Sequence, residues 1–125
     1  MRYSTRKRNT NANSAILNRY DTGYLGFSFA ATTHYTTEVP FDGQTMHVVV
    51  TLAQGDYPRV YVNGVLRSSS RTVMGLLPPS DVFYLGYSFI SGDVTMIGSI
   101  DEFRIWQGVL SASEIASHFA QGPGE

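Results

Sequence analysis

The segment from residue 98 to residue 115 constrains the fold more than any other part of this chain, because it predicts a strand followed directly by a capped helix. Ser111 and Glu114 have the Ser-x-x-Glu spacing of a capping box, in which each side chain bonds the backbone N–H of the other residue. Leu110 and Ile115 have the spacing of a hydrophobic staple across that cap. Local signals that agree in this way make the helix the firmest prediction from the sequence.

The residues before this cap predict a strand. Ile100, Phe103 and Ile105 are apolar and β-favouring, with polar residues between them. We expect this strand to connect tightly to a helix over residues 112–119, and the last residues to form a tail.

The rest of the chain predicts short strands about every ten residues, joined by turns rich in Gly, Asn and Asp. Asn63-Gly64 gives the strongest hairpin signal, because both residues accept the positive φ angles of a type I′ turn. This spacing, with no helical pattern before the last segment, predicts an all-β, antiparallel sandwich. The expected strands cover residues 15–20, 24–30, 34–39, 46–52, 59–62, 65–66 and 82–85.

The composition excludes several classes of protein. The 125 residues are 42% hydrophobic and 15% charged, which is typical of one globular domain over residues 1–125. The absence of cysteine excludes disulfides and thiolate sites. A net charge of −1 argues against a nucleic-acid or membrane partner, and no apolar run approaches the ~18 residues of a membrane span. Polar and basic residues follow Met1, so we expect no signal peptide in this chain.

Three stretches together resemble laminin G-like domains of the concanavalin A-like lectin/glucanase superfamily. Residues 98–115 resemble that family's closing Gly-x-Ile-Asp-Glu-x-Arg-Ile strand and Leu-Ser-x-x-Glu-Ile helix turn. Residues 45–51 resemble its Trp-His-His-Val-Ala-Val-Thr strand, with Thr45 in place of the Trp, and residues 59–66 resemble its Val-x-Leu-Tyr-Val-Asn-Gly hairpin. The resemblance implies a jelly-roll sandwich with one short C-terminal helix. From the resemblance we also expect the family's opening strand, which carries Phe-Asp-Gly, to be lacking before residue 1.

The resemblance implies a non-catalytic module that binds a glycan or a surface protein, extracellular or at a cell surface as part of a larger protein. A structural assembly protein, such as a virion or surface-layer component, and a degenerate glycosidase are the alternatives. Related hydrolases carry Glu-x-Asp-x-x-Glu on one strand, whereas here Ser99 takes the first position and Asp101 and Glu102 are adjacent. Because adjacent strand residues point to opposite faces, we expect no enzyme activity.

Exposed aromatic side chains are the candidate ligand-binding residues. Tyr20, Tyr35 and Tyr57 fall at predicted strand ends or loops, where a sugar could stack on the ring, although each could be an ordinary surface tyrosine. Trp106 is the other candidate, with packing under Leu110 and Ile115 as its alternative role.

Calcium is the one cofactor that the resemblance suggests. Family members often hold Ca²⁺ near a sheet edge with carboxylate and carbonyl oxygens, and Asp101 with Asp93 or Asp42 could supply two of these ligands. Alternatively, Asp101 accepts hydrogen bonds from the backbone or from an arginine. His34, His47 and His118 are too scattered in sequence to suggest a metal site or a catalytic triad.

The basic segment over residues 2–8 is the last feature to explain. Four of the nine basic residues lie there, and we expect them to protect an exposed sheet edge left open by the missing strand. Such an edge could support self-association as salt screens its charge.

Overall fold

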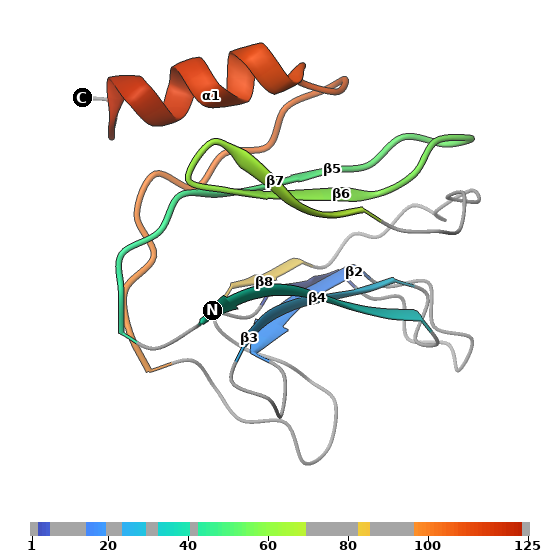
Figure 1. Cartoon of the computed structure of the whole chain (residues 1–125). Coiled ribbons are helices and arrows are strands. Elements are labelled where there is room, and N and C mark those ends of the chain that lie inside the picture. The colour runs from blue at the N-terminus through green and yellow to red at the C-terminus, as the bar shows by residue number, and fades with distance from the viewer. Residues whose placement is uncertain are drawn as a thin grey trace. The chain divides into compact units, whose positions relative to one another are not determined.

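The computed structural model describes residues 3–5, 15–19, 24–29, 33–40, 43–69, 83–85 and 97–123 (Figure 1). The chain divides into two compact units. One contains residues 1–43 and 77–100, and the other contains residues 44–76 and 101–125.

The first unit contains a five-stranded antiparallel sheet with the order β4-β3-β2-β1-β8. Its strands are β1 (Tyr3–Thr5), β2 (Ala15–Arg19), β3 (Tyr24–Phe29), β4 (Thr33–Pro40) and β8 (Phe83–Leu85).

The position of β1 corrects one prediction. Tyr3 pairs with Leu17 of β2 and with Leu85 of β8, so β1 is an inner strand and not an exposed edge. The residues that enter the sheet are Tyr3, Ser4 and Thr5, which carry no charge and tolerate strands well. The prediction of an exposed edge rested on the charge of residues 2–8, and the other residues of this segment lie outside the described part of the chain.

A bulge in β4 organises the described core of this unit. Gly26 pairs with Thr36 and Tyr24 with Pro40, so the stretch from Thr37 to Val39 lies opposite Leu25. The buried Thr37 hydroxyl donates to the Leu25 carbonyl oxygen at 2.7 Å and accepts from the Val39 N–H at 3.2 Å. The side chain thus replaces ladder bonds that the bulge removes, as buried backbone groups require.

The second unit contains a three-stranded antiparallel sheet, ordered β5-β6-β7, and the helix. The strands are β5 (Val48–Thr51), β6 (Arg59–Val62) and β7 (Val65–Ser69). The Asn63-Gly64 turn is confirmed, with φ angles of 51° and 79°. Asn63 also holds the residue directly before β5. Its Oδ1 accepts the His47 N–H at 2.9 Å, and its own N–H donates to the His47 carbonyl at 2.8 Å.

The central strand of this sheet supplies its core. Val60, Tyr61 and Val62 are 1%, 7% and 1% exposed. Since consecutive strand residues point to opposite faces, this run shows that β6 is covered on both sides. Pro58, just before the strand, is fully buried as well.

The helix α1 (Ala112–Gln121) confirms the capping prediction. The Glu114 N–H donates to Ser111 Oγ at 3.2 Å, and the Ser111 N–H donates to Glu114 Oε2 at 2.7 Å. Ile115 is fully buried. The helix lies over the β6–β7 turn, where a Cβ placed on Gly64 would lie 3.3 Å from the Ala116 Cα and 3.2 Å from the Phe119 ring (Figure 1).

The predicted closing strand is wrong. Residues 97–110 adopt no regular strand, and Ile105 is 73% exposed. Two local features prevent a ladder. The Glu102 N–H donates to Asp101 Oδ1 at 2.9 Å, and Glu102 has a left-handed φ of 53°, which interrupts a regular strand. Arg104 then pairs with Glu102. Antiparallel sheets and, among the described residues, one short helix are confirmed, while the jelly-roll connection of the strands stays a prediction.

Candidate binding surface at the β5–β6 loop

Tyr57 is an exposed aromatic residue in the loop between β5 and β6. It follows the turn that contains Gly55, whose φ is 79°, and precedes the buried Pro58 at the start of β6. The Tyr57 side chain is 42% exposed. A proline fixes its own φ and restricts the residue before it, so the backbone on the sheet side of Tyr57 has little freedom.

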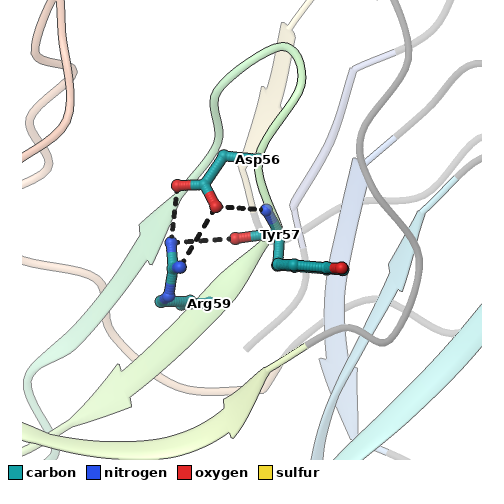
Figure 2. Close-up of polar contacts among 3 residues, drawn as sticks. All are labelled: Asp56, Tyr57 and Arg59. Atoms are coloured by element: carbon teal, nitrogen blue, oxygen red, sulfur yellow. Dashed lines mark hydrogen bonds and ion pairs between the residues drawn. The ribbon is translucent and has the colours of Figure 1, made fainter.

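An ion pair holds the other side of this loop. Arg59 Nη1 lies 2.8 Å from Asp56 Oδ2, and Arg59 Nη2 lies 3.1 Å from Asp56 Oδ1. Both residues also bond the backbone of Tyr57: its N–H donates to Asp56 Oδ1 at 2.7 Å, and its carbonyl accepts from Arg59 Nη1 at 3.2 Å. Figure 2 shows this closed network, with the Tyr57 ring pointing away from it. Both backbone polar groups of the tyrosine are thereby fixed.

Both charges of this pair are held in their ionised forms. The hydrogen bonds from Arg59, and then from the Tyr57 N–H, lower the pKa of Asp56. The bond to Asp56 raises the pKa of Arg59. An exposed pair stabilises a fold only slightly, so its effect here is to set the geometry of the loop. Tyr57 could be predicted from the sequence, whereas the support that Asp56 and Arg59 give to its backbone was not predicted. The opposite charges three residues apart around Tyr-Pro were the available signal.

Trp106 forms a second, separate aromatic site. It is 50% exposed, and its ring centroid lies 5.7 Å from that of His118, with the ring planes inclined by 41°. The packing of Trp106 under Leu110 and Ile115 stays a prediction. The last turn of α1 offers the His118 ring as its partner, and much of the indole remains accessible. This exposure agrees with the alternative role of a stacking platform.

His47 lies beneath the last turn of the same helix. Its ring centroid is 6.0 Å from the Phe119 ring, and its Nδ1 is buried with no hydrogen-bond partner. Burial, and secondarily the nearby His118, lower the pKa of His47. The backbone N–H and carbonyl of His47 both bond Asn63 of the β6–β7 turn, which fixes the residue directly before β5.

The remaining predicted residues are not brought together. Tyr35 lies inside β4, paired with Phe27, and not at a strand end. Tyr20, Asp42 and Asp93 fall outside the described residues. Asp101 is exposed and accepts the N–H of its neighbour. Within the described residues, no group of three or more His, Asp or Glu side chains could hold a metal ion, so calcium binding stays a prediction.

Comparisons with known proteins give the family. The model of the concanavalin A-like lectin/glucanases superfamily, laminin G type, matches residues 2–116. A crystal structure of an S-layer domain-containing protein from Clostridium thermocellum is similar, with 26% identity and a TM-score of 0.54. The similarity covers 89% of this chain but only 58% of that one.

A search of curated proteins found no match. Among the described residues, no helix is long and apolar enough to cross a membrane. The family match spans most of the sequence and includes the three motifs that first indicated the resemblance. The chain therefore belongs to the laminin G-like domains of the concanavalin A-like lectin/glucanase superfamily.

Proposed function

We propose that this chain is a non-catalytic carbohydrate-binding module of a cell-surface or extracellular protein, and that the β5–β6 loop contacts the glycan. The observation that carries the proposal is the exposed Tyr57 ring on a backbone fixed by Asp56, Arg59 and Pro58. A tyrosine offers a large, rigid, amphipathic contact at low entropic cost, and a loop ordered before binding keeps that cost low.

The carboxylates of the described residues support a binding role over a hydrolytic one. Glycosidases need a general acid whose pKa is raised, opposite a second carboxylate. The pKa values of Asp56 and Glu114 are both lowered, because each carboxylate accepts hydrogen bonds. Asp101 and Glu102 are adjacent on an exposed, irregular segment, and Glu102 is already paired with Arg104.

The binding test compares three variants on a panel of immobilised polysaccharides, followed by calorimetry on the best ligand. Tyr57→Ala should reduce affinity at least about tenfold, within the range for losing a stacked aromatic contact at an interface. Tyr57→Phe should retain most of the affinity, because it keeps the ring. Trp106→Ala measures the second aromatic site independently. Unchanged binding by Tyr57→Ala would remove the β5–β6 loop from the proposal.

Assembly of a surface layer is the second candidate. It is favoured by the similarity to an S-layer domain-containing protein. In that case the chain would bind other protein copies through its sheet edges, and no glycan of the panel would be retained. Light scattering at increasing protein concentration separates the two functions, since a glycan-binding module stays at one mass while an assembly protein grows.

A further inference from the structure

We propose that the β5–β6 loop selects neutral glycans over acidic ones, because the only cation beside Tyr57 in this loop is already neutralised. This inference rests on the proposed function and specifies the ligand class of the same site. Between Thr51 and Arg59 the sequence contains one charged residue, Asp56, so Arg59 and Asp56 together set the charge of the loop.

Arg59 has no unopposed charge to offer an anionic sugar. Its Nη1 donates to Asp56 Oδ2 at 2.8 Å and to the Tyr57 carbonyl at 3.2 Å, and its Nη2 donates to Asp56 Oδ1 at 3.1 Å. Two parallel bonds from a guanidinium to a carboxylate form the strongest common arrangement of such a pair. These bonds use three of the five guanidinium N–H groups, and a uronate or sulfate group that reached the others would still lie beside the Asp56 carboxylate.

Asp56 itself disfavours an anion and accepts a hydroxyl. Its side chain is 45% exposed, and it stays ionised because Arg59 and the Tyr57 N–H bond it. Oδ1 already accepts two hydrogen bonds, from Arg59 and from Tyr57, whereas Oδ2 accepts one from Arg59. Since each carboxylate oxygen has about two acceptor positions, Oδ2 retains one for a hydroxyl donor. A neutral sugar can donate a hydroxyl to this position, whereas the Asp56 carboxylate repels the charged group of an acidic sugar.

The test uses pairs of oligosaccharides that share length and linkage and differ in charge, for example cellohexaose with the corresponding cellouronic acid. The natural chain should bind the neutral member about fivefold or more tightly at low salt, as expected for one hydrogen bond to Asp56 Oδ2 that the acidic member makes less well. Asp56→Asn removes the negative charge and releases Arg59, so it should shift the ratio toward the acidic member. Arg59→Gln leaves Asp56 unopposed and should shift it further toward the neutral one.

These two variants control for each other. Both break the same ion pair, so a loosened loop would weaken binding in both without moving the ratio in opposite directions. Equal or tighter binding of acidic members by the natural chain, or parallel shifts in the two variants, would overturn the charge selection while leaving carbohydrate binding in place. If no member of any pair binds, the proposed function itself fails.

Discussion

Replacing Gly64 by alanine tests how α1 is attached to the sheet. The residue has a φ of 79°, and a new Cβ would lie 3.3 Å from the Ala116 Cα and 3.2 and 3.3 Å from two atoms of the Phe119 side chain. The left-handed conformation costs an alanine about 1–2 kcal/mol. Crowding adds about 1–3 kcal/mol, because the helix backbone at Ala116 cannot rotate away as a side chain can.

Gly55 provides a matched control. Its φ is also 79°, but a Cβ there meets nothing within 4 Å. Gly55→Ala should therefore show the conformational cost alone, and the effect of alanine on the unfolded chain, about 0.4–1 kcal/mol, cancels between the two variants. We expect Gly64→Ala to lower the free energy of unfolding by about 1 kcal/mol or more beyond Gly55→Ala in urea denaturation. Equal losses in the two variants would refute the docking of α1 on this turn.

Four further outcomes are expected. Ser111→Ala should destabilise the chain by about 1 kcal/mol in urea through loss of the cap, while Ser111→Thr retains most of the stability; an unchanged alanine variant would contradict the role of the cap. The lowered pKa of His47 means that the unfolded chain binds the proton more readily, so the melting temperature should fall as pH drops below about 6.5. His47→Gln should flatten that dependence, and an unaltered slope would rule out His47 as its source. Millimolar Ca²⁺ should leave the melting temperature unchanged; a rise that Asp101→Asn abolishes would establish a calcium site. Incubation with β-glucans and arabinans should release no reducing sugar, and turnover lost on Asp101→Ala would overturn the non-catalytic assignment.

The parts of the fold that follow from neighbouring residues could be predicted from the sequence. The Asn63-Gly64 turn needs two residues that tolerate positive φ, and the capping box needs Ser111 and Glu114 three apart. Each signal depends on backbone chemistry within a few residues, so no distant part of the chain could alter it.

The prediction failed where a local bond competed with a sheet. Ile100, Phe103 and Ile105 have a strand pattern, but Asp101 takes the backbone N–H of Glu102 that a neighbouring strand would have bonded. An apolar pattern alone does not reveal that competition. The position of β1 was missed for a similar reason, because total charge was counted over seven residues and only Tyr3, Ser4 and Thr5 enter the ladder.

The sequence predicted the aromatic residue of the candidate site but not the residues that hold it in place. Exposed tyrosines in loops can be recognised by residue type, which identified Tyr57. The opposite charges of Asp56 and Arg59 are visible in the sequence, but whether they pair around Tyr57 depends on how the chain turns before β6. The contact of Trp106 with His118 was not predicted, since it depends on which face of α1 turns toward the indole.

The bulge in β4 has a consequence for solubility. β4 is the outer strand of the described five-stranded sheet, and a flat outer strand is a template on which foreign chains add and aggregates grow. At the bulge, Thr37 directs its hydroxyl inward to Leu25, and Glu38 is exposed with a left-handed φ of 56°. A charged residue on a locally distorted backbone interrupts the row of N–H and C=O groups that an incoming strand would need. We therefore expect the bulge that Thr37 stabilises to hinder intermolecular β-structure at high concentration.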